Sequence, residues 1–137
     1  MTGIPVGGHA RVQGEALAEI STRLVEIHRR YYGQGPAEAK AEMLDDMVVC
    51  TLVGGFTTVE RTLIEAGDRG SVYGTRLGFQ QTMENDFRRI VEEATGRTVI
   101  ACMSAVHLDT ELAVELFVLE ALSERELPAT GTGADGG

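Results

Sequence analysis

The polar residues whose types could support chemistry fall mainly at two places in the sequence. His107 and Asp109 follow a long apolar run, while Asp45 and Asp46 form an adjacent acidic pair. An imidazole and carboxylates are the groups that proteins use to transfer protons and to hold divalent metals. We expect His107 and Asp109 to lie where a strand exits into a loop, from which both side chains could reach a cleft beside a sheet.

A metal site would need further ligands, and Asp45, Asp46, Glu111 and His28 are the candidates. The sequence contains no compact ligand spacing such as His-Glu-x-x-His or Cys-x-x-Cys. A tight turn would account for both aspartates, and an ordinary loop hydrogen bond would account for His107. The sequence therefore predicts no cofactor and identifies no metal, and leaves these polar residues as candidate ligand-binding groups.

Nucleophilic catalysis is disfavoured by the spacing of the available groups. Ser104, His107 and Asp109 are the right types, but they lie along one strand and its loop, where neighbouring side chains point to opposite sides. A Gly-x-Ser-x-Gly elbow is absent from the sequence. Cys50 and Cys102 each lie in an apolar run, which predicts buried free thiols. We therefore predict no catalytic residues.

Two short motifs indicate where helices end and begin. Gly33, Gly35 and Pro36 follow a helical pattern and can stop it, because glycine permits a left-handed backbone and proline blocks continuation. The same loop could bind an anion, but phosphate-binding loops follow a strand and open a helix. Thr57 and Glu60 have the spacing of a capping box at the start of a helix.

Hydrophobic periodicity predicts the elements that position these residues. Long amphipathic helices are expected over Val12 to Tyr32 and Leu77 to Ala94, a short helix over 58–66, and strands over 37–44, 47–53, 97–106 and 112–119. This α-β-β-α-α-β-β order predicts a two-layer α+β fold, with two long helices covering a largely antiparallel four-stranded sheet. We expect one domain over residues 10–123, between disordered tails at 1–9 and 124–137.

Charge and hydropathy exclude two classes of partner. The 137 residues carry 21 acidic and 12 basic side chains, a formal net charge of -9, which disfavours nucleic-acid binding. No apolar run approaches the roughly 20 residues needed to span a bilayer, and the first residues lack the pattern of a signal peptide. These features predict a cytoplasmic protein without a membrane span.

The face of the sheet away from the helices is expected to be apolar. The residues that predict this are Val49, Val53, Ala101, Met103, Phe117 and Leu119. Few charges would then meet water on that face, so we predict that it is covered by a second copy in a homodimer, or by another protein. The alternative is a monomer whose helices divide over both faces of the sheet.

Several landmarks recur in a fixed order along the chain. They are Tyr32-Gly33-Gln34-Gly35-Pro36, Asp45-Asp46, Leu52-Val53-Gly54-Gly55-Phe56-Thr57, Glu60-Arg61-Thr62-Leu63, Phe87 to Arg97, Ser104, His107, Asp109, and the strand Val114 to Leu119. Together, from about Ala16 to Glu120, they resemble the MpsC-domain family, first classed as a domain of unknown function. The family is named for a Na+-translocating membrane potential-generating system.

The resemblance implies a role beside a membrane process. In some bacteria, members are encoded next to membrane and cytosolic proteins linked to inorganic-carbon uptake, and no settled catalytic residues come with the family. This implies a bacterial, non-catalytic accessory protein that acts through protein–protein contacts, with a protein partner at the membrane system. The alternative is a small ligand- or metal-binding sensor or enzyme, which would use the loop from His107 to Glu111 together with Asp45 and Asp46.

Overall fold

Seven helices and strands run in the predicted order in the computed structural model, which describes residues 4–122. They are α1 (Ile4–Tyr32), β1 (Glu38–Leu44), β2 (Met47–Val53), α2 (Thr58–Glu65), α3 (Arg69–Thr95), β3 (Val99–His107) and β4 (Leu112–Leu119). No helix in this part of the chain is both long enough and apolar enough to cross a membrane.

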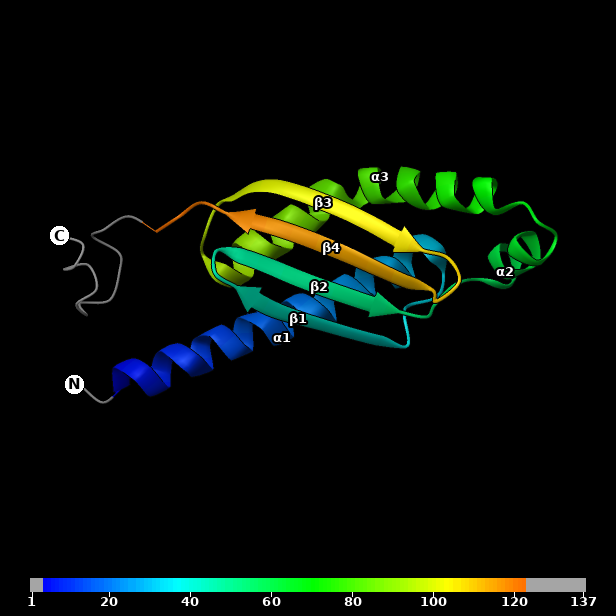
Figure 1. Cartoon of the computed structure of the whole chain (residues 1–137). Helices are drawn as coiled ribbons and strands as arrows, with labels where there is room; N and C mark the ends of the chain where they lie inside the picture. Colours follow the sequence, from blue (N-terminus) through cyan, green and yellow to red (C-terminus); the bar gives the residue numbers. More distant parts are fainter. Residues whose placement is uncertain (1–3, 123–137) are drawn as a thin grey trace.

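The four strands form one antiparallel sheet in the order β1-β2-β4-β3. The two sequence-adjacent hairpins therefore meet through their second strands, β2 and β4. Figure 1 shows α1 and α3 crossing behind the sheet, on the same side of it. This arrangement confirms the two-layer α+β fold, in which helices cover one face only.

The core lies between the sheet and the two long helices. It is built from every second residue of the central strands, including Val48, Cys50, Leu52, Ala113, Phe117 and Leu119, packed on Ile20, Leu24, Met83 and Phe87. The prediction that Phe117 and Leu119 lie on the outer face is wrong. Val48 pairs with Phe117 in the β2–β4 register, so both side chains point toward the helices.

Both long helices begin earlier than the hydrophobic pattern indicates. The first takes in residues 4–9, which we expected to be a disordered tail, and its first turn contains Pro5, where proline's missing N–H breaks no helical bond. The third begins at Arg69 instead of Leu77, because the Asp68 side chain accepts a hydrogen bond from the Ser71 N–H at 3.3 Å. The predicted tail at 124–137 lies outside the described residues.

The turns predicted from the sequence are present at two points where the chain changes direction. Asp45 and Asp46 form the two-residue turn between β1 and β2, and Asp45 has a φ of 55°, a left-handed conformation that aspartate tolerates. Gly33 follows α1 with a φ of 79°. The hairpin interpretation of the acidic pair and the helix-stop interpretation of Gly33 are both confirmed.

Candidate functional site

The candidate site is made of buried polar residues that contact one another, and not of the residues in the loops. Within the described side chains they are His28, Glu60, Arg76, Gln80 and Glu115. They divide into two groups. One is centred on the Arg76–Glu60 ion pair at the junction of α2 and α3, and the other on Glu115 in the middle of β4.

The ion pair has bidentate geometry. Arg76 Nε donates to Glu60 Oε2 at 2.6 Å and Arg76 Nη2 donates to Glu60 Oε1 at 2.7 Å. The guanidinium lies between the rings of Tyr32 and Phe56, with its carbon 4.0 Å from each ring centroid. Such stacking suits arginine, whose planar and weakly hydrated cation can be buried between aromatic faces.

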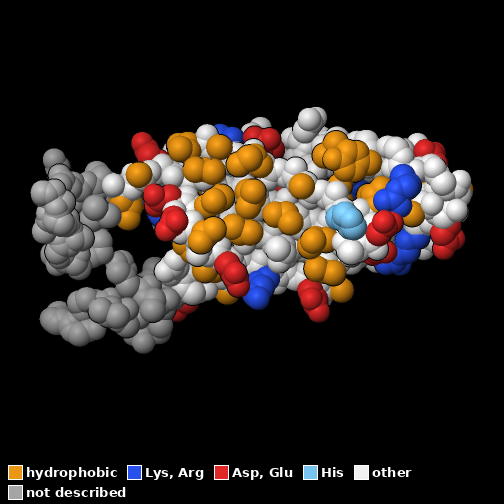
Figure 2. All heavy atoms as spheres, in the orientation of Figure 1, with side chains coloured by type: hydrophobic (Ala, Val, Ile, Leu, Met, Phe, Trp, Pro, Cys, Tyr) orange, Lys and Arg blue, Asp and Glu red, His pale blue; other side chains and the backbone are white. Residues whose placement is uncertain are grey.

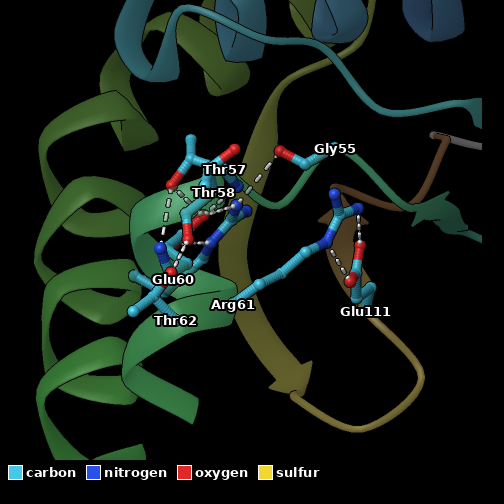
Figure 3. Close-up of polar contacts among 8 residues, drawn as sticks. Gly55, Thr57, Thr58, Glu60, Arg61, Thr62 and Glu111 are labelled. Carbon is cyan, nitrogen blue, oxygen red and sulfur yellow. Dashed lines mark hydrogen bonds and ion pairs between the residues drawn. The ribbon is translucent and has the colours of Figure 1, made fainter. Parts of the chain in front are cut away.

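Glu60 also caps the helix that carries it. The Thr57 side chain accepts from the Glu60 N–H at 3.1 Å, and the Thr57 N–H donates to Glu60 Oε1 at 2.8 Å, which confirms the predicted capping box (Figure 3). Burial opposes ionisation of Glu60, but the hydrogen bonds from Arg76 and Thr57 outweigh it and lower the pKa. The carboxylate therefore ties the start of α2 to α3.

His28 belongs to the same buried region and supports packing instead of chemistry. Its Nδ1 lies 2.8 Å from the Leu24 carbonyl oxygen, and its ring stacks on Phe87 and Tyr32 at centroid distances of 5.5 and 5.9 Å. Burial lowers the pKa of His28, so the ring is kept neutral. Its role as a metal ligand, considered from the sequence, has no support in this arrangement.

The second group surrounds a buried carboxylate. Glu115 lies on the helix-facing side of β4 with 1% of its surface exposed. Gln80 Nε2 donates to its Oε2 at 3.2 Å, and the Ser104 hydroxyl donates to its Oε1. Burial raises the pKa of Glu115 to about 7, against the opposing effect of these two hydrogen bonds.

A pocket of about 170 Å³ lies beside this carboxylate. Its lining residues are Leu77, Gln80, Gln81, Glu84, Cys102 and Ser104. Two of them, Gln80 and Ser104, are the hydrogen-bond partners of Glu115. The Gln80 Oε1 is buried and accepts no hydrogen bond from any described residue. A hydrogen-bond acceptor is therefore left unused next to the buried Glu115 carboxylate.

The residues singled out from the loops do not come together. Asp46 accepts from Arg97 Nη2 at 2.7 Å, beside the pairing of Met47 with Val118. His107 and Asp109 lie at the other end of the sheet, where Val53 pairs with Leu112. The shared site of the sensor or enzyme alternative would need these two ends to meet, and the length of β2 separates them.

His107 and Asp109 each have a nearby partner of their own instead. His107 Nδ1 lies 2.8 Å from Thr110 Oγ1, and Asp109 accepts from Arg69 Nη1 at 2.7 Å. Ser104 faces the helices and bonds Glu115, whereas His107 points from the opposite face of β3. A Ser-His-Asp triad is therefore not formed. Over residues 13–122, no three His, Cys, Asp or Glu side chains are grouped so as to hold a metal ion.

The sequence analysis missed Arg76, Gln80 and Glu115. The signal for Glu115 was present, since it is the one charged residue in the apolar strand Leu112–Leu119 and shares its face with Ala113 and Phe117. No comparable signal marks the other two, because a polar residue on a long helix is usually exposed.

The opposite side of the sheet is an uncovered apolar surface, called here the open face. Apart from His107 at the end of β3, its residues are the outward-pointing members of the three strands β2, β4 and β3: Met47, Val49, Thr51, Val53, Leu112, Val114, Leu116, Val118, Ala101, Met103 and Ala105. Figure 2 shows hydrophobic side chains spread across this side of the molecule. Met103 is 51% exposed and Val53 is 37% exposed.

Fold and site together define a two-layer α+β domain with one open sheet face and a small polar pocket beneath the sheet. Residues 12–121 match the family described as Na+-translocating membrane potential-generating system (MpsC), and the chain belongs to that family. No curated protein and no solved structure matches the chain. The family assignment made from the landmark residues is confirmed.

Proposed function

We propose that this chain is a cytoplasmic, non-catalytic accessory protein that acts through protein–protein contacts of the open face, and that its first partner is a second copy of itself. The observation that supports the proposal is the apolar open face of the sheet, which no described part of the chain covers. The family description names a membrane potential-generating system, and the accessory role proposed here would be exerted beside such a system.

The size of the open face favours an interaction surface. Strands lie about 4.8 Å apart and rise about 3.3 Å per residue, so the three strands of the open face, with seven to nine residues each, span roughly 15 by 25 Å. Uncovered apolar patches of more than a few hundred Å² on soluble domains usually mark interaction sites. Packing of a second sheet on the open face would remove this surface from water. Burial of apolar area stabilises such a complex by about 25 cal/mol per Å².

The distribution of charge permits a second copy as the occupant of the open face. The chain carries a formal net charge of -9, so two copies repel each other over most of their surfaces. On the outward side of the sheet the acidic side chains and the lysine lie on β1, as Glu38, Lys40 and Glu42, while His107 lies at the end of β3. Two copies that meet through the centre of the open face bring little like charge together.

Sedimentation equilibrium over a range of concentrations tests the self-association. Met103→Asp places a charge in the middle of the open face and should shift the equilibrium toward monomer by at least about tenfold. Val59→Asp is the matched control, because Val59 is 68% exposed on α2, away from the sheet. A wild-type chain that stays monomeric at all concentrations, or two variants with equal effects, would contradict the proposal.

The link to the membrane system needs a separate readout. Cells that lack the protein should show a reduced sodium-dependent membrane potential, which the wild-type chain restores. Met103→Asp should fail to restore it, while Val59→Asp should succeed. Full restoration by Met103→Asp would show that the open face is not the surface through which the accessory role is exerted.

A further inference from the structure

Strand β1 is an uncovered edge of the sheet. Among the described strands it pairs with β2 alone, and Figure 1 shows α1 behind it rather than beside it. Leu44 pairs with Met47 across the two-residue turn, and the pair that closes such a hairpin exchanges both of its backbone hydrogen bonds. Hydrogen-bonded pairs alternate along an antiparallel ladder, so the backbone groups of Ala39, Ala41 and Met43 point away from β2. They can bond a further strand.

The outward side chains of this edge alternate in charge, as Glu38, Lys40 and Glu42. Lys40 and Glu42 are 73% and 66% exposed, and their charged atoms lie 3.3 Å apart. Charges on an edge strand usually prevent it from pairing with another chain. A strand with complementary charges is the exception, because opposite charges that face each other across two strands stabilise the pair. The charge pattern of β1 therefore decides which strand this edge accepts.

The sequence of β1 is complementary to itself. Two copies overlap over their full length when they run antiparallel with Ala41 opposite Ala41, the middle residue of Glu38–Leu44. In this register Lys40 of each copy lies directly opposite Glu42 of the other. These are non-hydrogen-bonded pairs, in which opposed side chains lie closest. The hydrogen-bonded pairs are those that use the outward backbone groups of Ala39, Ala41 and Met43.

The neighbouring registers are unfavourable. A slide of two residues in one direction places Lys40 opposite Lys40 and Glu38 opposite Glu42, and a slide of two residues in the other direction places Glu42 opposite Glu42. A slide of one residue would set the outward backbone groups of one copy against groups that the other copy already bonds to β2. Charge and hydrogen bonding thus select the same register.

We propose that β1 pairs antiparallel with β1 of a second copy about Ala41, so that two four-stranded sheets join into one sheet of eight strands. This is strand addition at a sheet edge, in which main-chain hydrogen bonds hold the strands together and side chains set the register. On the helix-facing side, Ala39, Ala41 and Met43 are partly buried against the core. Pairing sets Met43 of one copy opposite Ala39 of the other, a large side chain beside a small one.

A hollow beside β1 agrees with this register. Its volume is about 480 Å³, and its lining residues are Ala37, Glu38, Ala39, Lys40, Thr51 and Val53. At the other end of the same strand, Leu44 is 57% exposed. The register centred on Ala41 places Leu44 of the second copy opposite Glu38, at this hollow. An exposed apolar side chain would therefore gain apolar neighbours at each end of the contact.

This contact goes beyond the proposed function and uses a different surface. Edge pairing uses backbone groups in the plane of the sheet, whereas packing on the open face uses the side chains of β2, β4 and β3. The edge contact is small and its ion pairs are exposed, and each exposed pair is weak. It should therefore appear as a second association step, at higher concentration than the association through the open face. Met103→Asp should weaken the first step and leave the second.

Reversal of single charges in the Met103→Asp chain tests the pairing. Sedimentation equilibrium of this chain at raised concentration should show a monomer–dimer equilibrium. Adding Lys40→Glu, or adding Glu42→Lys, sets like charges opposite each other twice and should weaken the dimer by at least about tenfold. Glu38→Lys is the matched control, because Glu38 lies opposite Leu44 in the proposed register, and it should leave the dimer intact. The unfolding midpoint of each variant confirms that it is folded.

An equal mixture of the two weakened chains distinguishes strand pairing from a general effect of charge. One chain then carries acidic side chains at positions 40 and 42 and the other carries lysines, so both opposed pairs are attractive again. The mixture should associate at least about tenfold more tightly than either chain alone.

Amide hydrogen exchange locates the contact within the strand. On association, the amides of Ala39, Ala41 and Met43 should exchange at least about tenfold more slowly, while those of Lys40 and Glu42, already bonded to β2, should change little. A Met103→Asp chain that stays monomeric at every concentration would overturn edge pairing and leave the proposed function standing. Association unaffected by both charge reversals, a mixture no tighter than its components, or protection that does not alternate along β1 would also overturn it.

Discussion

Arg76 of α3 and Glu60 of α2 form a bidentate ion pair at 2.6 and 2.7 Å, with side chains only 5% and 10% exposed. Tyr32 at the end of α1 and Phe56 after β2 cover the two faces of the guanidinium. Arg76 therefore contacts residues of α1 and α2 and of the segment that follows the central strand β2, and so joins all three helices to the sheet. The short helix α2 depends on this contact, since it has few other residues in the core.

Replacing Arg76 with Met should lower the free energy of unfolding by about 3–5 kcal/mol, because it leaves the Glu60 carboxylate buried without a cation. Chemical denaturation with urea measures the change. Arg61→Met is the matched control: Arg61 also makes two hydrogen bonds to a glutamate, Glu111, at 2.8 and 2.9 Å, but lies on the surface (Figure 3). Its effect should be far smaller. Equal losses in the free energy of unfolding for the two variants would show that burial of the Arg76–Glu60 pair does not increase its contribution to stability.

The stability of the fold should depend on the ionisation of Glu115. Its pKa is raised from 4.5 to about 7 in the folded state, so the folded chain holds a proton that the unfolded chain has released. This contribution is complete below about pH 4.5 and is lost as the pH rises through about 7, a change of about 3 kcal/mol. Denaturation at a series of pH values should show the loss in the wild type.

Glu115→Gln cannot ionise and should flatten this pH dependence. The lowered pKa of His28 acts in the opposite direction, since its neutral ring loses stability as the pH falls below the unfolded value of 6.5. Subtracting the variant's profile from that of the wild type removes the His28 contribution, which both share. Parallel profiles for the two chains would show that Glu115 is ionised in the fold throughout this range.

Gly55→Ala should destabilise the fold much more than Gly33→Ala. Both residues have positive φ, 85° and 79°, so both substitutions bring backbone strain of about 1–2 kcal/mol. At Gly55 an added Cβ would also lie 2.8 Å from the Gly35 carbonyl oxygen and from Pro36 Cα, whereas at Gly33 it would meet nothing within 4 Å. Thermal unfolding of the two variants gives the comparison, and equal losses would contradict the close approach of the two loops.

The two cysteines should differ in their reaction with a thiol reagent. Cys50 is 1% exposed and burial raises its pKa to about 12, so it should react only when the chain unfolds. Cys102 is half-buried at the pocket beside Arg88, and should react first in the native state, although burial raises its pKa as well. Native labelling followed by peptide mapping identifies the modified residue. Faster labelling of Cys50 would mean that β2 opens more readily than the core packing implies.

Local patterns in the sequence were enough to predict most elements. Apolar spacing of three and four located the helical stripe at Leu17, Ile20 and Leu24, and the Thr57-to-Glu60 spacing located the start of α2. These features depend on contacts between residues a few positions apart, which a linear pattern records. The starts of α1 and α3 were misjudged, because a helix can continue past its buried stripe when a cap or a tolerated proline permits it.

Which side of the sheet a residue faces was less accessible from the sequence. Phe117 and Leu119 were expected on the outer face together with Val49 and Met103, yet they point into the core. A strand that is apolar on both faces carries no alternation to indicate which half is buried. The pairing register of β4 with β2 determines which residues of β4 point into the core. Shifting that register by one residue would exchange the two faces.

By itself, the sequence determined the order of elements, the turn at Asp45 and Asp46, and the cap at Thr57, since each depends on residues close together in the chain. It also determined the family, through the order of landmarks along the chain. Only the tertiary structure decided that Arg76 pairs with Glu60 and that Gln80 and Ser104 meet at Glu115. These partners lie 11 to 35 positions apart in sequence. Their contact depends on how helices pack on the sheet, which no local pattern encodes.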